Sequence, residues 1–410
     1  MTTPAPVRPE DRLVSLDLAR GLAVLGILAV NAAAFSMPFE AYMAPEMGPF
    51  PMEGASAQAW WAVATFFEQK FVTLFSMLFG VSIFLVGGER RDVEKSPVLR
   101  RRLFWLLAIG ILHGAVIWYG DILTLYALMG FLMLLMRSWK PRGLLILGVV
   151  LVLLNMVLES AQASVALAPP EQLDQIRAQM GLPTQEAILA AIERNREGFQ
   201  ASLMQNLQNW GMLAAIQLIG YGAKTLGLMM IGLALFKLGF LKGRAPAWVY
   251  VLFVAIGAGA LYVIGTETAK ILAIDFAFPQ AYVHKLANVW LAPLATLGYV
   301  SVLMLALKLG LKGLLFPLTA AGRMAFTNYL TQSLIMTAIF YGGRGLELYG
   351  QLDRPEVLQI VAGVWLAQLI WSPLWLSVFS MGPLEWIWRC LSYGRMVPIT
   401  KAGAARVAAA

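Results

Sequence analysis

Ionisable side chains interrupt several apolar stretches that are long enough to cross a membrane, and these side chains could do chemistry there. Glu68 and Lys70 lie in one stretch, whereas His113, Lys224 and Arg323 lie in three others. An ionised group is costly in hydrocarbon, so such groups face polar cavities or pair with one another. The pattern therefore indicates proton transfer, or recognition of a charged ligand, inside the membrane.

His113 is the candidate general base, because a neutral imidazole takes up and releases protons near neutral pH. Asp121 follows eight residues later, which is about 12 Å along a regular helix. We therefore expect a water molecule or a substrate, and not a direct hydrogen bond, to connect the two side chains. Gly110 and Gly114 would let another helix approach closely, so a purely structural contact of His113 is an equal alternative.

The stretch SLDLARGLAVLGILAVN supplies three further polar candidates. Asp17 and Arg20 are three residues apart, so they share a helix face near one membrane surface. They either form a solvated interfacial pair or contact a charged ligand. Asn31 lies toward the opposite end, where its amide can bond to a neighbouring helix or orient a substrate carbonyl.

Glu68 and Lys70 are two residues apart, so on a continuous helix they point to different faces. Each then needs its own partner or water. The alternatives are interhelical pairing for stability and the polar wall of a pocket.

AAGRMAFTNYLTQSL is the least apolar of the long stretches. Its polar residues recur at helical spacing and form a stripe, namely Arg323, Thr327, Asn328, Gln332 and Ser333. Arg323 can bind a phosphate, a carboxylate or a lipid headgroup, or pair with Glu68 or Glu385. Together with the residues above, the candidate ligand contacts are Asp17, Arg20, Glu68, Lys70, Trp118, Tyr126, Lys224, Arg323, Thr327, Asn328 and Gln332.

Composition identifies the class of protein. Hydrophobic residues make up 59% of the 410 residues, charged residues 13%, and the mean hydropathy is +0.70; soluble domains carry about 25% charged residues. The chain is therefore predicted to be an integral membrane protein whose first apolar stretch is a retained helix. Its single cysteine, Cys390, excludes an internal disulfide and a thiolate cluster, and its two histidines argue against a metal site. It has no Walker loop and no GxSxG motif.

A membrane-spanning helix needs about 20 apolar residues. The sequence predicts an all-α bundle of ten spans, at residues 16–37, 59–87, 103–120, 122–136, 143–159, 211–236, 247–265, 286–307, 318–341 and 357–379. Five spans fall within 1–159 and five within 211–395. Residues 160–210 form a hydrophilic helical segment between the two halves, and 396–410 are expected to be a disordered tail.

Charge predicts the orientation of these spans. With the N-terminus inside, the inner segments hold 21 of the 31 Lys and Arg residues, the outer segments hold seven, and three are embedded. The positive-inside rule therefore predicts that both termini are cytoplasmic. The net charge of +8 reflects loops beside anionic lipid, and no nucleic-acid partner is expected.

The segment 160–210 is predicted to lie outside the cell membrane. Pro170 and Gly181 suit the start and stop of a short helix. Beyond it, Ile188 and Ile192 begin an apolar stripe on a second, amphipathic helix. This helix either lies on the membrane surface or caps the mouth of a cavity.

Several motifs together resemble the YeiB family of bacterial inner-membrane proteins. They are RLVSLDLARGLAVLGILAVN, LFSMLFG, HGAVIWYGDILTLYALMG, AAGRMAFTNYLTQSL and GPLEWIWRCLSYG, and they span nearly the whole chain. The resemblance implies an inner-membrane location and a C-terminal domain of unknown function. The family has been labelled as transport-related without a firm activity.

The start of the chain also resembles, more distantly, the transmembrane acyltransferases, which include heparan-α-glucosaminide N-acetyltransferase and bacterial sugar O-acyltransferases. That resemblance implies a cytoplasmic donor, usually acetyl-CoA, near Asp17, Arg20 and Arg323. It also implies a reaction centre near Asn31, which would polarise the donor carbonyl. The sugar O-acyltransferases have a histidine near the position of Asn31, and the heparan enzyme has one just before its second helix. Here that region reads SAQAWWAV, so the resemblance requires His113 to act as the base, beside Asp121.

Three functions remain open from the sequence. The first is acyl transfer to a lipid or sugar, with His113, Asn31 and Asp121 as catalytic residues and acyl-CoA as donor. The second is transport or flipping of a small or amphiphilic molecule, coupled to protons through Glu68, Lys70, His113 and Lys224. The third is non-catalytic binding of a lipid or a protein partner. Membrane lipids are expected neighbours in every case, and a homo-oligomer is compatible with each function.

Overall fold

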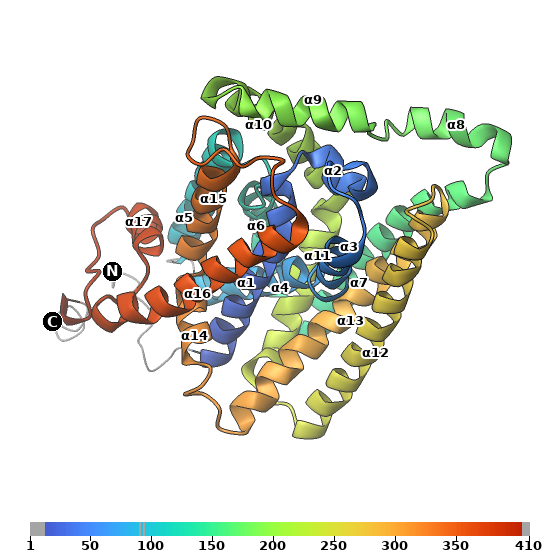
Figure 1. The fold of residues 1–410 in the computed structure, drawn as a ribbon. Coiled ribbons are helices and arrows are strands. Elements are labelled where there is room, and N and C mark those ends of the chain that lie inside the picture. Colours follow the sequence, from blue (N-terminus) through green and yellow to red (C-terminus); the bar gives the residue numbers. More distant parts are fainter. Residues whose placement is uncertain (1–12, 90–91, 93–94, 404–410) are drawn as a thin grey trace.

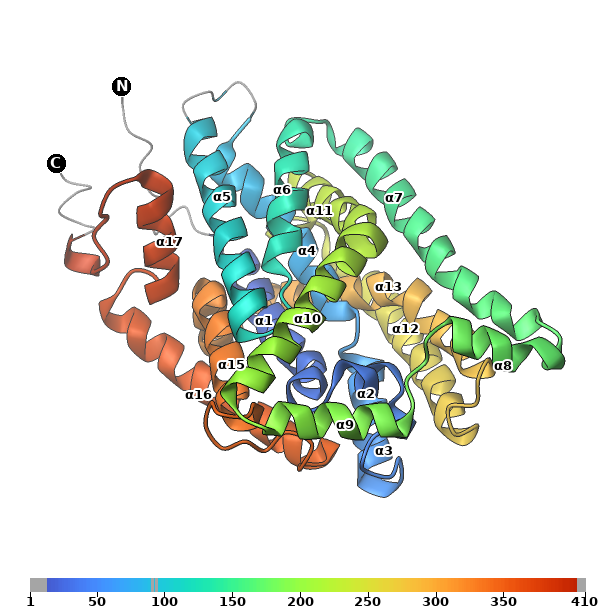
Figure 2. The ribbon, with the colours of Figure 1, turned by 90° about the horizontal axis from the view of Figure 1, so that it is seen from above.

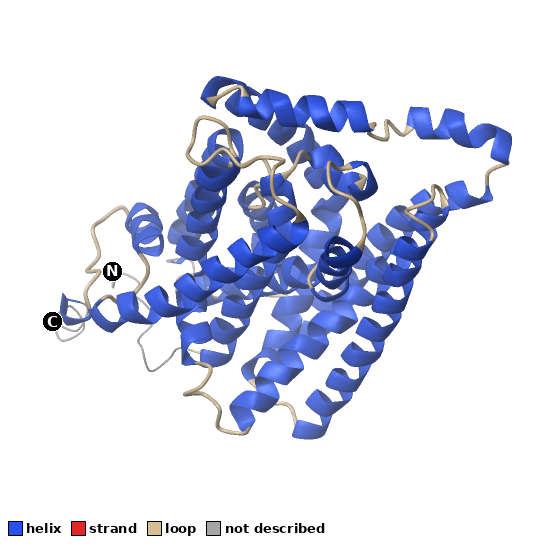
Figure 3. Cartoon of the chain, in the orientation of Figure 1, coloured by secondary structure: helices blue, strands red, loops and turns tan. Residues whose placement is uncertain are grey.

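The computed structural model describes residues 13–89, 92 and 95–403, and helices dominate this part of the chain (Figures 1 and 3). The α-helices are α1 (Val14–Ser36), α2 (Phe39–Met43), α3 (Gly54–Phe66), α4 (Lys70–Gly87), α5 (Ser96–Leu112), α6 (Leu123–Met136), α7 (Pro141–Ala161), α8 (Pro170–Gln179), α9 (Gln185–Arg196), α10 (Phe199–Ile216), α11 (Gly222–Lys237), α12 (Ala247–Ala273), α13 (Gln280–Lys308), α14 (Phe316–Arg323), α15 (Ala325–Phe340), α16 (Arg354–Val378) and α17 (Pro383–Tyr393). The predicted all-α class is confirmed.

The predicted count of ten spans is not confirmed. Seven helical segments of the described chain are long and apolar enough to cross a membrane, namely Val14–Ser36, Gly54–Gly87, Pro141–Leu167, Phe199–Lys237, Ala247–Ala273, Gln280–Lys308 and Arg354–Val378. The apolar helix α6 is shorter. Two predicted spans, 103–120 and 318–341, are each interrupted by a change of backbone conformation.

The second predicted span is also two helices instead of one. α3 ends at Phe66 and α4 begins at Lys70, and Gln69 between them has a left-handed φ of 64°. A non-glycine residue in this conformation is uncommon and ends regular helix geometry. The expectation that Glu68 and Lys70 occupy different faces of one helix is therefore wrong, because the two residues belong to a turn and to the helix that follows it.

The third predicted span ends in a wider turn. α5 continues from Leu112 into a π-helical turn at His113–Ile117, after which Trp118 adopts an extended conformation. Asn206 of α10 donates hydrogen bonds to the carbonyls of Gly114 (2.9 Å) and Ala115 (3.0 Å). These bonds satisfy carbonyls in the wider turn, where ordinary i→i−4 helix pairing changes.

α1 lies at the centre of the bundle, where α4, α14, α15 and α16 pack around it (Figures 1 and 2). α4 also packs on α11, and α12 pairs with α13 at one side of the molecule. Glycines permit the closest approaches. A Cβ atom added to Gly322 of α14 would collide with the Asp17 carbonyl of α1, and one added to Gly232 of α11 would collide with the Met77 carbonyl of α4. The two predicted halves are therefore packed into one another.

Helices α8 and α9 lie across one end of the bundle (Figure 1). α8 spans Pro170–Gln179 and is followed by Gly181 at a φ of +61°, as the sequence predicted. Ile188 and Ile192 of α9 are buried against the bundle, and Asn195 accepts a hydrogen bond from the Gly342 amide (3.3 Å). α9 thus packs on this end of the bundle, and whether it also lies on the membrane surface or closes the mouth of a cavity stays a prediction.

The first part of the expected disordered tail is ordered. The Ile399 carbonyl accepts hydrogen bonds from the amide (2.8 Å) and hydroxyl (2.9 Å) of Ser380, and Thr400 forms a short antiparallel bridge with Phe379. The prediction is therefore wrong for 396–403. Residues 404–410 lie outside the described part of the chain.

Candidate functional site

A cavity of about 290 Å³ opens in the half of the bundle that charge predicts to be cytoplasmic. The start of α1 forms one wall, and α4, α5, α6, α15 and α17 form the others. Most of its lining is apolar, including Phe75, Phe79 and Leu103. Its polar lining includes four arginines and two carboxylates, namely Arg20, Arg102, Arg323, Arg389, Asp17 and Glu385. The cavity thus combines guanidinium groups with a surface suited to an alkyl chain.

Asp17 and Arg20 neutralise one another at this cavity. Arg20 Nη1 lies 2.7 Å from Asp17 Oδ1, and Nη2 donates to the Ser82 hydroxyl at 3.3 Å. The predicted pair is therefore present on one helix face. Its position in the cavity wall agrees with the predicted contact to a charged ligand, but its own charges already balance.

Glu385 is held by the start of α15. Its carboxylate accepts from the amides of Phe326 (2.8 Å) and Thr327 (3.0 Å) and from the Thr327 hydroxyl (2.5 Å). Anionic groups are favoured at a helix N-terminus, where backbone amides lack helical acceptors. Burial nevertheless raises the pKa of Glu385 above its ordinary value. Glu385 is thus held at the start of α15. Arg323 donates from Nη2 to the Ser380 carbonyl (3.2 Å).

Arg102 carries a charge that no carboxylate of the described residues pairs with at ion-pair distance. Its guanidinium stacks over the Trp388 ring at 3.7 Å from the centroid. Such stacking fixes the side chain while leaving its donors available. Among the described residues that line the cavity, guanidinium groups outnumber carboxylates four to two, a composition that suits an anion.

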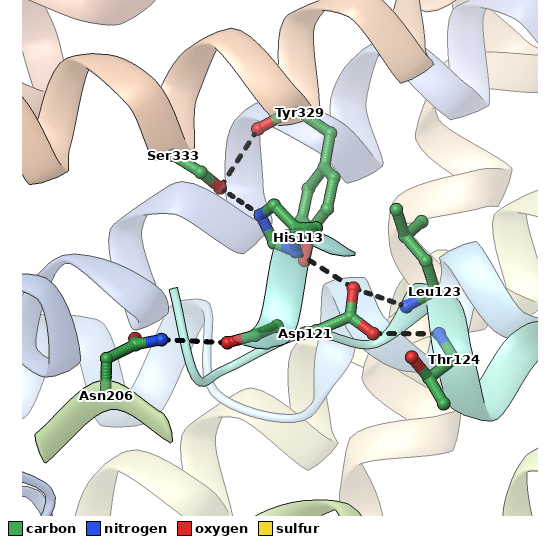
Figure 4. Close-up of polar contacts among 8 residues, drawn as sticks. His113, Asp121, Leu123, Thr124, Asn206, Tyr329 and Ser333 are labelled. Carbon is green, nitrogen blue, oxygen red and sulfur yellow. Dashed lines mark hydrogen bonds and ion pairs between the residues drawn. The ribbon is translucent and has the colours of Figure 1, made fainter. Parts of the chain in front are cut away.

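A chain of three buried polar side chains lies deeper in the bundle (Figure 4). Asp121 Oδ1 lies 2.9 Å from His113 Nδ1, and His113 Nε2 lies 2.9 Å from the Ser333 hydroxyl. All three side chains are almost fully buried, with residue exposures of 3%, 1% and 1%. The expectation that Asp121 and His113 are too far apart for direct contact is wrong. It assumed a regular helix, whereas the π-turn and extended Trp118 fold the chain back.

The backbone of α6 decides which protons this chain carries. Asp121 accepts from the amides of Leu123 (3.1 Å) and Thr124 (2.8 Å), so both of its oxygens act as acceptors at the start of α6. A carboxylate that accepts from two amides is suited to accept a further hydrogen bond from His113 Nδ1. In that tautomer the Nε2 lone pair of His113 faces Ser333. The arrangement orients the imidazole as a base toward a hydroxyl group.

Tyr329 separates this chain from the cavity. Its ring lies 5.4 Å from the His113 ring between centroids, and the same side chain lines the cavity. Its buried hydroxyl lies near the Ile122 backbone and has no hydrogen-bond partner of ordinary geometry among the described residues. Tyr329 therefore belongs to the cavity wall and also contacts His113.

Other predicted residues near this region make contacts within the protein. Trp118 stacks on Phe35 at 4.0 Å between ring centroids, and its indole nitrogen lies 3.5 Å from the Ala34 carbonyl. Tyr126 lines the cavity and shares a hydrogen bond of 2.8 Å with Ser76. Asn31 is half-buried in α1, and no described hydrogen bond connects it to His113 or to Ser333.

The polar stripe on α15 mainly ties helices together. Asn328 donates to the Ser372 hydroxyl (3.1 Å), and Gln332 donates to Gln368 (2.8 Å), both on α16. Thr327 holds Glu385, as described above. Asn328 and Gln332 are buried and lie outside the cavity wall. Their geometry favours helix association over contact with a ligand.

Lys70 and Lys224 lie around the break between α3 and α4, away from the arginine-lined cavity. The Lys70 ammonium donates to Asn288 (2.6 Å) and to the Ala64 carbonyl (3.0 Å). Lys224 donates to Gln69 (2.9 Å) and forms an ion pair with Glu159 (2.9 Å). Glu68 is half-buried and forms no ion pair with a described residue.

Replacing Glu159 with leucine should destabilise the protein by about 3 kcal/mol, because Lys224 would stay mostly buried without its counter-charge. Thermal unfolding in detergent measures the effect. Adding Lys224→Met to the same chain should restore most of the loss. A double variant as unstable as the single variant would contradict an electrostatic role for the pair.

A second cavity, of about 360 Å³, lies near the opposite end, between the α2 region, the α8–α9 connection and the α12–α13 turn. Two carboxylates and two bases line it, namely Glu46, Asp275, Arg177 and Lys285. Burial raises the pKa of Glu46, against the lowering effect of the two bases. None of the predicted site residues lines this cavity.

Four residues of the site were missed or undervalued in the sequence. In the sequence, Arg102 and Arg389 were counted only as charges of the predicted cytoplasmic segments. Arg389 directly follows an aromatic residue, and Arg102 directly precedes an apolar helical stretch. Ser333 was noted only as part of the polar stripe, and Tyr329 was not noted at all. Their spacing of four residues on α15 was a usable signal, because it places both side chains on one helix face.

Comparisons with known proteins define the family. Residues 235–395 match the family model described as "Protein of unknown function (DUF418)". The uncharacterized protein YxaH of Bacillus subtilis is 34% identical over 98% of this chain and 99% of its own length. The uncharacterized protein YeiB of Escherichia coli is 33% identical over 93% of this chain and 96% of its own.

A more divergent relative is an uncharacterized 39.9 kDa protein encoded in the amylase 3′ region of Bacillus acidopullulyticus, 24% identical over 96% of this chain and 97% of its own. No solved structure matches the chain. The similarity to YxaH and YeiB extends over almost the full length of all three chains. The chain therefore belongs to the YeiB family, with the DUF418 domain of unknown function in its C-terminal part.

Proposed function

We propose that this protein transfers an acyl group from an anionic, amphiphilic donor to a hydroxyl or amine acceptor inside the membrane. The observation that carries the proposal is the juxtaposition of two features. Tyr329 lines an arginine-containing, mainly apolar cavity, and the Tyr329 ring packs on a His113 imidazole that contacts Asp121. The distant resemblance to transmembrane acyltransferases points the same way, although fold-level analogy alone is weak support for function.

The arginines of the cavity are suited to binding the anionic part of the donor. Phosphate and carboxylate groups bind guanidinium through paired, charge-assisted hydrogen bonds. Arg102, Arg323 and Arg389 face one cavity whose remaining wall is mainly apolar. An activated acyl compound with phosphate groups, such as acyl-CoA, would place its anionic part among them. Its acyl chain would then extend past Phe75 and Phe79 toward Tyr329.

His113 would supply the general base. Its Nε2 accepts the proton of the attacking group, while Asp121 stabilises the imidazolium that forms. Asn31 was expected to polarise the donor carbonyl, but no described hydrogen bond connects it to this centre. The buried Tyr329 hydroxyl is the better candidate for that task, because it lacks a partner of ordinary geometry and its side chain lines the cavity.

Replacing Arg102 with glutamine should weaken donor binding about 10-fold or more, because it removes a charged hydrogen-bond donor from the cavity. Native mass spectrometry of the purified protein with acetyl-CoA and a long-chain acyl-CoA measures the affinity. Arg100→Gln is the matched control, since it makes the same change on an exposed residue of the same helix.

Two results would count against this function. Equal losses in the Arg102 and Arg100 variants would indicate non-specific charge attraction. An amphiphile that binds in the cavity and is released unchanged, with no acylated product from any acceptor, would favour movement of that molecule across the membrane instead.

A further inference from the structure

We propose that Ser333 is the nucleophile of this reaction and carries the acyl group as a covalent ester between two half-reactions. The inference rests on the proposed function and deepens it, because it replaces direct transfer with a two-step path. It follows from the hydrogen bonds of one serine hydroxyl on α15 and from the groups behind it.

The first argument is the direction of the hydrogen bond. Asp121 accepts from two backbone amides and from His113 Nδ1, so His113 Nε2 is left as an acceptor. In the tautomer that carries its proton on Nδ1, the contact of 2.9 Å between Nε2 and the Ser333 oxygen uses the serine proton. A hydroxyl whose proton points at an oriented base is the arrangement that activates serine for attack.

The second argument comes from the other serines and threonines of the same bundle. Hydroxyls on membrane helices usually donate to the carbonyl four residues earlier. That contact is short for Ser76 (2.8 Å), Ser82 (2.9 Å), Ser160 (2.7 Å), Ser392 (2.6 Å) and Thr337 (2.8 Å). For Ser333 the corresponding distance, to the Tyr329 carbonyl, is 3.4 Å. The Ser333 hydroxyl thus keeps a long helical contact, and its shorter contact is the one to the imidazole (2.9 Å).

The third argument concerns access. Ser333 is 1% exposed and does not itself line the cavity, whereas Tyr329, one helical turn earlier, does. The Tyr329 hydroxyl is not anchored by a hydrogen bond of ordinary geometry among the described residues. Rotation of this one side chain would join the arginine-lined cavity to the Ser333–His113 contact. Tyr329 is thus the barrier that an incoming acyl chain displaces.

The chemistry balances with an activated acyl donor such as a thioester. The Ser333 oxygen forms a bond to the acyl carbon, its proton moves to His113 Nε2, and the carbon–sulfur bond breaks. The proton then passes from His113 to the departing thiolate. In the second step an acceptor hydroxyl attacks the Ser333 ester, its proton moves to His113, and the Ser333 oxygen leaves and takes that proton.

The test is covalent labelling of the whole purified protein with a long-chain alkyl fluorophosphonate, read by intact and peptide mass spectrometry. The probe forms a phosphorus–oxygen bond to an activated serine and releases fluoride. We expect one adduct per chain, on the peptide that contains Ser333. Ser333→Ala should abolish it and His113→Ala should lower its rate at least 100-fold, whereas Thr331→Ala, a neighbouring hydroxyl bonded to carbonyls of its own helix, should not change it.

A second variant keeps the test informative if Ser333→Ala does not fold. Ser333→Cys keeps the size and position of the group, and its thiol should become acylated by the donor itself, giving a thioester that hydroxylamine removes. Failure of the wild-type chain to form an adduct, or labelling that survives Ser333→Ala, would overturn the assignment of Ser333.

Acyl transfer measured in the same variants separates the two proposals. Transfer that persists in Ser333→Ala but is lost in His113→Ala would leave the proposed function in place and exclude Ser333 as the nucleophile. Transfer that is unaffected by either change, or absent from the wild-type protein with every donor, would remove the proposed function as well.

Discussion

Replacing Asp121 with asparagine should lower the rate of acyl transfer by about 10²- to 10⁴-fold, the range typical of general-base catalysis. The amide oxygen can still accept from the Thr124 amide, but the NH₂ group would stand in place of Oδ1, lose the bond from the Leu123 amide and donate to His113 Nδ1. His113 would then carry its proton on Nε2 and could no longer accept one from Ser333 or from an acceptor. The substitution should lower kcat and leave the affinity for the donor unchanged.

The same substitution should lower stability by about 1 kcal/mol, because the Leu123 amide loses its acceptor. Asp353→Asn is the control, since the Asp353 side chain also accepts from backbone at a helix start, that of α16, outside the arginine-lined cavity. Transfer rates and thermal unfolding midpoints of both variants would be compared. If Asp121→Asn and Asp353→Asn reduced transfer equally, the aspartate would have no special role in orienting His113.

Replacing Gly322 with alanine should destabilise the protein by about 3 kcal/mol or more, which is the upper range for overpacking. A Cβ at this position would collide with the Asp17 carbonyl of α1 and press on the Gly21 amide, both of which are backbone groups. The colliding backbone atoms can move apart only if α1 and α14 themselves separate. Because Asp17 and Arg323 both line the cavity, donor binding should weaken in the same variant.

Thermal unfolding and size-exclusion profiles in detergent would measure this effect. Gly259→Ala provides the control, because a Cβ there meets no atom within 4 Å on the equally helical α12. Alanine at an open helical site should be neutral or stabilise by up to about 1 kcal/mol. Similar midpoints for the two variants would show that α1 and α14 are not held at their closest approach by glycine.

Composition and hydropathy were sufficient to predict the class, the helical fold and the long spans, because membrane helices must be apolar over their whole length. The interruptions at Gln69 and after His113 were not predictable in the same way. Neither place has a proline, and the sequence TFFEQKFVTLF reads as one helix by periodicity. Tertiary contacts stabilise these breaks. One example is the pair of hydrogen bonds that Asn206 donates to the Gly114 and Ala115 carbonyls.

The sequence identified His113 and Asp121 as important but placed them too far apart. The error came from extending regular helix geometry through the segment 113–121, where the structure has a π-turn and an extended residue. Arg102 could not be assigned to the cavity from sequence, because a cluster of arginines at a helix start is also what the positive-inside rule expects. Only tertiary packing shows that one of them turns inward over Trp388.

The central position of α1 has a consequence for how the chain is assembled during synthesis. α1 is the first apolar helix to be made, yet α14, α15 and α16, which enclose it, are made about 300 residues later. Until those three helices have been made, Asp17, Arg20 and the glycine face of α1 remain next to lipid or the insertion machinery. Truncation just before α14 would thus leave the earliest helix with α4 but without three of the helices that pack around it, even if every earlier span had entered the membrane.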